Sequence, residues 1–149
     1  MRRLELAERE QGRLTVIERA RIVEAFSSRL DHYLNEGYGS CLLRDERAAE
    51  IVKAALEYFH GERYQLHAWC IMPNHVHVAM TPAPGHHIDR LLHSWKSYSA
   101  HEINRELGRT GKVWQKEYFD RIVRDEQDMQ NVIAYIVGNP AKAETSEFG

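Results

Sequence analysis

The chain has 149 residues, of which 43% are hydrophobic and 28% are charged, and its formal net charge is −2; these values are typical of a globular protein and predict a single domain over residues 1–149. No apolar run reaches the roughly 20 residues that span a membrane, and the first residues lack the apolar segment of a signal peptide, so we expect a cytoplasmic protein without a membrane partner. The two cysteines, Cys41 and Cys70, are too few for a disulfide framework and are not spaced as a zinc knuckle.

Two segments in the first sixty residues have the apolar spacing of helices. Residues 15–36 predict a helix because their apolar side chains recur with a period close to 3.6, at Ile22, Val23, Phe26, Leu30, Tyr33 and Leu34. Residues 46–60, "ERAAEIVKAALEYFH", follow Asp45, whose side chain is suited to an N-cap. They predict a second helix.

The remainder of the chain alternates strand and helix patterns. "YQLHAWCIM" (64–72) and "HVHVAM" (75–80) flank a Pro-Asn pair and predict an antiparallel hairpin. Residues 88–107 predict a helix, residues 112–123 an extended segment that ends in a strand, and residues 126–138 a last helix that stops before Pro140. This order predicts an α+β fold, in which helices pack on a small antiparallel sheet.

The second strand of the hairpin contains two histidines, His75 and His77, one residue apart. Residues at i and i+2 of a strand point to the same face, so both imidazoles leave the sheet side by side. Such a pair can bind one divalent cation through neutral ring nitrogens. The alternative is two surface histidines on a half-exposed strand.

The last predicted helix carries Tyr135 and Asn139 four residues apart, so the two side chains share one face. The amide oxygen of Asn139 is an acceptable ligand for Mg²⁺ or Mn²⁺. If this helix packs across the histidine face of the hairpin, Tyr135 becomes a nucleophile beside a metal that polarises a phosphodiester. Three alternatives stay open: a core tyrosine, an asparagine that merely ends a helix before proline, and Tyr118 as the nucleophile.

Three motifs, "IMPNHVH", "VWQKEYFDRIVRDEQD" and "YIVGNPAKA", together resemble the HUH single-strand DNA transposases with one catalytic tyrosine, and most closely the REP-associated tyrosine transposases. The resemblance runs from about Gly37 to Lys142. It implies a ferredoxin-like fold, bound Mg²⁺ or Mn²⁺, and cleavage and rejoining of single-stranded DNA beside a palindromic hairpin through a 5′-phosphotyrosine. It assigns the metal to His75, His77 and Asn139 and the nucleophile to Tyr135. Family members often dimerise, so a homodimer is a further expectation.

Both ends of the chain depart from this family pattern. Members usually begin with a strand of the "YHVTFR" kind, whereas this chain begins with predicted helix, and "RLTVI" (13–17) is the only candidate remnant. The ending "AETSEFG" is shorter than the expected tail. We therefore expect the first strand to be missing, truncated or supplied by a partner chain, which questions the activity more than the fold.

Basic residues are concentrated in one part of the chain, because residues 87–124 carry eight lysines and arginines against five acidic residues. By default these are solvated charges, but beside the proposed site they would hold a DNA backbone, and Trp114 would stack on a base. The predicted DNA-binding residues are Lys96, Arg105, Lys112, Trp114, Lys116, Arg121 and Arg124.

Three functions stay open at this point. The first is a metal-dependent transposase that acts on single-stranded DNA. The second is a truncated, inactive relative that binds a nucleic-acid hairpin without cutting it. The third is a small structural or regulatory protein whose histidine pair is incidental. The distance between the histidine pair and the Tyr135 helix separates the third function from the first.

Overall fold

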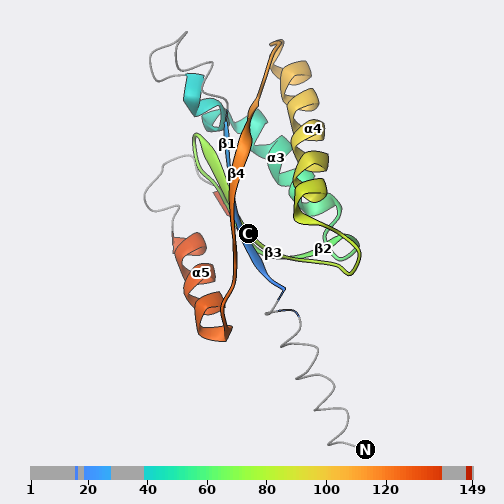
Figure 1. The fold of residues 1–149 in the computed structure, drawn as a ribbon. Coiled ribbons are helices and arrows are strands. Elements are labelled where there is room, and N and C mark those ends of the chain that lie inside the picture. Colours follow the sequence, from blue (N-terminus) through green and yellow to red (C-terminus); the bar gives the residue numbers. More distant parts are fainter. Residues whose placement is uncertain (1–15, 17–18, 28–38, 139–146, 149) are drawn as a thin grey trace, which may run out of the picture.

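The computed structural model describes residues 16, 19–27, 39–138 and 147–148. One sheet separates two layers of helices: α3 (Glu46–Tyr58) and α4 (Ile88–Leu107) lie against one face, and α5 (Glu126–Gly138) lies against the other (Figure 1). The predicted α+β fold is confirmed, while a single domain over all 149 residues stays a prediction. Within the described part of the chain, no helix combines the length and the apolar character required to cross a membrane.

The sheet has the strand order β4-β1-β3-β2-β5, and all neighbouring strands are antiparallel. The strands are β1 (Arg21–Ser27), β2 (Tyr64–Ile71), β3 (His75–Pro82), β4 (Trp114–Ile122) and β5 (Glu147–Phe148), and a 3₁₀ helix, η1 (Gly39–Arg44), precedes α3. The chain order β1–α3–β2–β3–α4–β4, with β1 and β3 in the centre, is the split βαβ arrangement of ferredoxin-like folds. The predicted hairpin and the predicted helices over 88–107 and 126–138 are confirmed.

The predicted helix over residues 15–36 is wrong at Arg21–Ser27, which form the central strand β1. Because "RIVEAFS" is short, its apolar residues fit a helical period and an alternating one equally well. Pairing decides between them: Ile22 lies opposite Ala79 of β3 and Arg121 of β4. The first strand that we expected to be missing is therefore present, while most of "RLTVI" and residues 28–36 lie outside the described residues.

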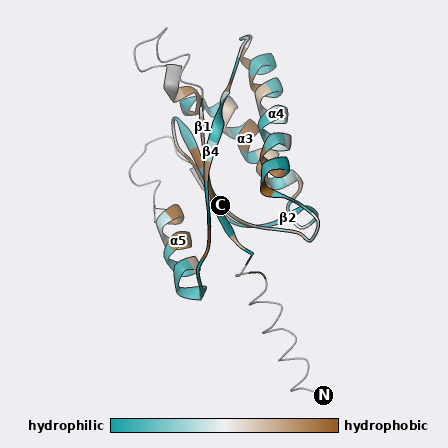
Figure 2. Ribbon diagram, viewed as in Figure 1, coloured by the Kyte–Doolittle hydropathy of each residue, from teal (hydrophilic) through white to brown (hydrophobic). Residues whose placement is uncertain are grey.

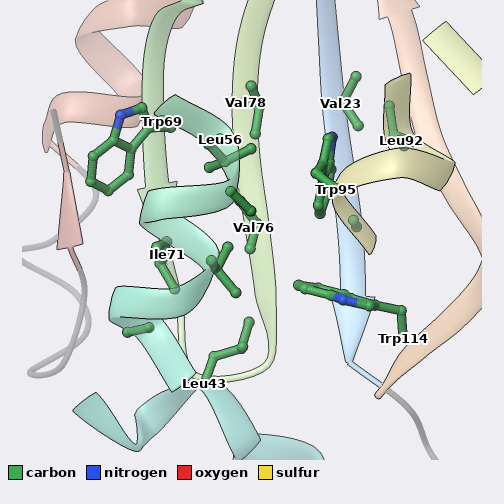
Figure 3. Close-up of a cluster of buried hydrophobic side chains, with 14 of the residues drawn as sticks. Val23, Leu43, Leu56, Trp69, Ile71, Val76, Val78, Leu92, Trp95 and Trp114 are labelled. Carbon is green, nitrogen blue, oxygen red and sulfur yellow. The ribbon is translucent and has the colours of Figure 1, made fainter. Parts of the chain in front are cut away.

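Side chains of β1 and β3 alternate between the two faces of the sheet. Val23, Val76 and Val78 belong to the large core beneath α3 and α4, together with Trp95 of α4 (Figure 3). Residues one position away point to the opposite side, where Ala79 packs under α5. The histidines at 75 and 77 share the parity of Ala79, so they face the α5 side.

Helix α5 approaches the sheet closely because the residues beneath it are small. Val132 and Ile136 of the helix pack on Ala68, Cys70 and Ala79 of β2 and β3. Short side chains at these three positions leave room for the branched residues of the helix. The buried residues of α5 therefore fix the rotation of the helix on the sheet, and this rotation determines which of its other side chains lie above β3.

Candidate functional site

His75 and His77 meet on the α5 face of the sheet, as their spacing predicts. Their ring centroids are 4.6 Å apart, and their Nε2 atoms are separated by 2.9 Å. His77 is almost fully buried, with 6% of its surface exposed, and His75 is half-buried. The two Nε2 atoms are thus aimed at one point.

The other ring nitrogen of each histidine faces an oxygen acceptor. Nδ1 of His75 lies 2.7 Å from Oδ1 of Asn74, and Nδ1 of His77 lies 3.2 Å from Oε1 of Glu24. An Nδ1 that donates its hydrogen to such an acceptor leaves a lone pair on the Nε2 of the same ring. Two such lone pairs at this separation would favour a cation shared between them.

Burial keeps both imidazoles neutral. Burial and the neighbouring His77 lower the pKa of His75 to about 4, despite the opposing effect of the Glu24 carboxylate. Burial also lowers the pKa of His77 below its ordinary value. The lowered pKa values favour the neutral rings, which are the form that binds metals, and a neutral His77 would make its contact with Glu24 a hydrogen bond.

Strand β1 supplies a neighbour for each histidine. Glu24 is paired in register with His77 and Phe26 with His75, and the Phe26 ring stacks on the His75 ring at 5.1 Å and 27°. Because this segment was predicted to be a helix, neither Glu24 nor Phe26 was predicted to lie beside the histidines. The signal that could have found them is the alternation of Ile22, Glu24 and Phe26 with the buried Val23, Ala25 and Ser27.

Helix α5 brings Tyr135 to the histidine pair. Its ring centroid lies 5.9 Å from that of His77, with the rings at 84° to each other, and 55% of the residue is exposed. Ile136, next along the helix, is 1% exposed and holds this turn on the sheet. Asn139, the predicted third ligand, lies outside the described residues, directly after Gly138 at the end of α5.

Tyr118, the rival nucleophile, lies on the opposite face of the sheet. It packs against the core beneath α3 and α4, and Nζ of Lys96 on α4 is 5.4 Å from its ring centroid. Because the histidine pair faces α5, the sheet separates it from Tyr118. The structure thus favours Tyr135 over Tyr118.

The start of α5 is attached to the end of β4 through Asp128. The Asp128 carboxylate accepts hydrogen bonds from both terminal nitrogens of Arg121, at 2.8 and 3.0 Å, and from the backbone N–H of Arg124 at 2.9 Å. Asp125 caps the helix by accepting the backbone N–H of Asp128 at 2.8 Å. The bonds from Arg121 first, and then that from Arg124, hold the pKa of Asp128 well below its usual value.

Replacing Asp128 with asparagine is expected to lower the free energy of unfolding by about 1–3 kcal/mol at pH 7, because charge-assisted hydrogen bonds are lost from a buried side chain. Since the folded state lowers the pKa of Asp128, this contribution is complete above the ordinary carboxyl pKa near 4 and is lost as the pH falls below it. Urea unfolding of both proteins at several pH values checks both statements. Glu62→Gln, in an exposed turn, is the control, and a difference that does not shrink in acid would contradict the assignment.

Three of the predicted DNA-binding lysines line one groove between α4 and β4. Lys96, Lys112 and Lys116 surround a depression of about 480 Å³, and Nζ of Lys96 donates to the backbone carbonyl of Gln115 at 2.9 Å. Hydrophilic residues predominate along β4, which is an edge strand (Figure 2). The groove lies on the α4 side, so DNA that contacts both groove and histidines has to pass around this edge.

The remaining predicted DNA-binding residues also have contacts within the protein. The side chains of Arg121 and Arg124 contact Asp128, and Arg105 donates to Glu102 at 2.6 Å, but all three arginine side chains stay largely exposed. Trp114 is 5% exposed, and its indole N–H donates to Oγ of Ser99 at 2.9 Å. Little of the Trp114 ring is exposed for stacking on a base, because the ring is part of the core (Figure 3), and base stacking by Trp114 stays a prediction that this burial disfavours.

Phe119 of β4 is an exposed aromatic residue that sequence reasoning missed. It is 72% exposed and is paired in register with Glu24, on the same face of the sheet as the histidines. A ring with this exposure presents a flat aromatic face of the kind on which nucleic-acid bases stack in other proteins. The alternation of "KEYFDR" could have found it once Tyr118 was placed in the core.

Comparisons with known proteins match most of the chain to one family model. Residues 37–139 match the family model described as "Transposase IS200 like". Among curated proteins, the chain is 27% identical over 85 residues to a Haemophilus influenzae protein named as a REP-associated tyrosine transposase. The aligned segment covers 50% of this chain and 48% of that protein. The chain thus spans about half the length of the curated relative it matches.

Two solved structures share the fold. One is the structure of a REP-associated tyrosine transposase bound to a REP hairpin. It superposes with a TM-score of 0.55 at 16% sequence identity, and the match covers 85% of this chain and 69% of that transposase chain. The other is a crystal structure from Deinococcus radiodurans described as that of a transposase, with a TM-score of 0.54 and 18% identity, covering 80% of this chain and 88% of that one. At these identities the likeness extends to the fold, and the matched family segment begins after β1.

Proposed function

Because the chain belongs to the IS200-like transposase family, we propose that it cleaves and rejoins single-stranded DNA beside a hairpin, with Tyr135 as the nucleophile and a divalent metal at His75 and His77. The observation that carries this proposal is the 5.9 Å approach of the Tyr135 ring to the ring of His77, whose Nε2 is paired with that of His75. The solved relative bound to a REP hairpin supports a hairpin ligand.

In the proposed reaction, Oη of Tyr135 attacks the scissile phosphorus and loses its proton. The bond from phosphorus to the 3′ oxygen breaks, and the departing oxygen takes up a proton, so that a 5′-phosphotyrosine and a free 3′-hydroxyl remain. The energy of the phosphodiester is retained in the phosphotyrosine, and a 3′-hydroxyl can later reverse the step without an energy cofactor. More than half of the Tyr135 residue is exposed, so a bulky polymer can approach it from solvent.

The two Nε2 atoms, 2.9 Å apart, would both be placed to hold one divalent cation. Oxygen ligands would complete the coordination that Mg²⁺ or Mn²⁺ requires. A divalent ion there would draw electron density from the scissile phosphate and stabilise the charge that develops on it. We propose Asn139 as a third ligand, since it follows the last turn of α5.

The two other functions that the sequence left open lose their main support. A binding protein without activity was favoured by a missing first strand, and β1 is present in the centre of the sheet. An incidental histidine pair would be expected to lie far from the Tyr135 helix, but the rings of His77 and Tyr135 are in contact. A homodimer stays a prediction.

A covalent adduct tests the proposed function. The protein is incubated with a single-stranded oligonucleotide that contains a hairpin and is labelled at its 3′ end, in Mn²⁺ or in EDTA, and is then separated by denaturing electrophoresis. We expect label to migrate with the protein in Mn²⁺ and not in EDTA. A protein that binds the oligonucleotide equally well in both conditions and forms no adduct in either is a binding protein, and the proposal is then wrong.

Phe119 is expected to stack on a base close to the cleaved bond, since it lies on the histidine face two strands from β3. Phe119→Ala should weaken binding of a fluorescent single-stranded oligonucleotide about 5- to 150-fold, because one stacked base contributes about 1–3 kcal/mol. The dependence on salt should be unchanged, since no phosphate contact is removed. Tyr58→Ala, at an equally exposed ring on α3, is the control, and equal losses in both variants would contradict the assignment.

A further inference from the structure

We propose that Glu24 is a positioning residue of the metal site: its carboxylate accepts the Nδ1 hydrogen of His77 and so keeps Nε2 of that ring deprotonated and directed at the point it shares with His75. The metal in this statement rests on the proposed function, whereas the hydrogen bond does not. Glu24 precedes the segment that matches the family model, which begins at residue 37.

The backbone holds Glu24 in place from both sides. Its strand, β1, is central in the sheet, and Glu24 lies opposite His77 of β3 and Phe119 of β4. From this position Oε1 of Glu24 reaches Nδ1 of His77 at 3.2 Å. The side chain of His77 is 8% exposed and that of Glu24 36%, so the carboxylate connects a buried ring with solvent.

Glu24 acts on the ring and is not a third ligand in this arrangement. Among the described residues, no group of three or more histidine, cysteine or acidic side chains is placed to hold one metal ion. The carboxylate contacts Nδ1, whereas the atom that faces His75 is Nε2. These two nitrogens lie on different edges of the imidazole, so a metal at Nε2 and the carboxylate at Nδ1 are on opposite sides of His77.

A neutral imidazole carries one hydrogen, and its location decides whether Nε2 can bind a metal. With hydrogen on Nε2, His77 would present an N–H to His75 and to any cation. The carboxylate favours hydrogen on Nδ1 and increases the basicity of Nε2, as acceptors behind metal-binding histidines commonly do. Asn74 has the corresponding place at His75, but with a neutral amide oxygen. The charged acceptor thus lies behind the more buried ring.

The hydrogen bond can be tested without metal. Long-range ¹H–¹⁵N spectra of the metal-free protein distinguish the two neutral tautomers of a histidine. We expect the Nδ1–H form at His77 in the unaltered protein, a mixture of forms in Glu24→Ala, and the Nδ1–H form again in Glu24→Gln, whose amide oxygen still accepts. A His77 that is protonated on Nε2 in the unaltered protein, or that is unchanged in Glu24→Ala, overturns the proposal.

Metal affinity is the second measurement, made by Mn²⁺ titration with detection by electron paramagnetic resonance. We expect Glu24→Ala to bind Mn²⁺ about 10- to 100-fold more weakly, and Glu24→Gln to fall between the two. Glu50→Ala, which removes a carboxylate from the exposed side of α3, should bind as the unaltered protein does. Equal affinity in Glu24→Ala and the unaltered protein, or equal losses in the alanine and glutamine variants, overturns the positioning role.

These two measurements also separate the inference from the proposed function. If the unaltered protein binds no Mn²⁺, the metal of the proposed function is wrong, and the tautomer of His77 alone decides the role of Glu24. Circular dichroism of each variant shows whether the secondary structure as a whole is retained, and Glu24→Gln keeps the test decisive if the alanine variant unfolds.

Discussion

Tyr135→Phe is expected to abolish the covalent protein–DNA adduct and to lower the cleavage rate at least about 1,000-fold, because it removes the only atom that attacks phosphorus while retaining the ring. The ring contact with His77 is preserved in phenylalanine, so the α5 helix should keep its place on the sheet. With 55% of Tyr135 exposed, loss of the hydroxyl should leave stability almost unchanged. The measurement is single-turnover cleavage of a labelled hairpin oligonucleotide in Mn²⁺.

Tyr118→Phe is the matched control for this variant. Tyr118 is partly buried against the core on the α4 side of the sheet, so the sheet lies between it and a phosphate held at the histidines. We expect full adduct formation by Tyr118→Phe, and an unchanged Mn²⁺ affinity in both variants. An adduct that persists in Tyr135→Phe and disappears in Tyr118→Phe would reverse the assignment of the nucleophile.

Loss of either histidine is expected to have the second-largest effect. His75→Ala and His77→Ala should each weaken Mn²⁺ binding more than about 100-fold. Loss of a residue that only supports a metal ligand costs up to about 100-fold, and loss of the ligand itself should cost more. Cleavage should fall in parallel, since one of two converging Nε2 ligands is gone. Mn²⁺ titration and the cleavage assay are run on the same preparations, so that loss of affinity and loss of rate can be compared directly.

His93→Ala, on the exposed surface of α4, controls for the loss of a histidine as such. His77 is buried, so its alanine variant also leaves a cavity, and thermal unfolding has to show that the protein is folded. His75 is more exposed and provides the same test with less structural risk. If either variant retains both Mn²⁺ affinity and cleavage, the metal is held elsewhere.

Local patterns were sufficient for most elements of this fold. The helices over 88–107 and 126–138 have long amphipathic patterns and clear ends, and the structure places them at these bounds. The hairpin around Pro73 and Asn74 is equally local, since its two strands are neighbours in sequence and in space. Strand β1 is different, because its hydrogen-bonding partners lie about 50 and 100 residues further along the chain.

The sequence by itself determined that His75 and His77 lie side by side, because the period of a strand is two whatever surrounds it. It also determined that a tyrosine precedes the end of the last helix. Only the tertiary structure decided that Tyr135, and not Tyr118, faces the histidines, that Trp114 is buried, and that Glu24 and Phe26 orient the two rings. These outcomes depend on which face of the sheet each helix covers and on pairing between distant strands, and neither is encoded in the spacing of neighbouring residues.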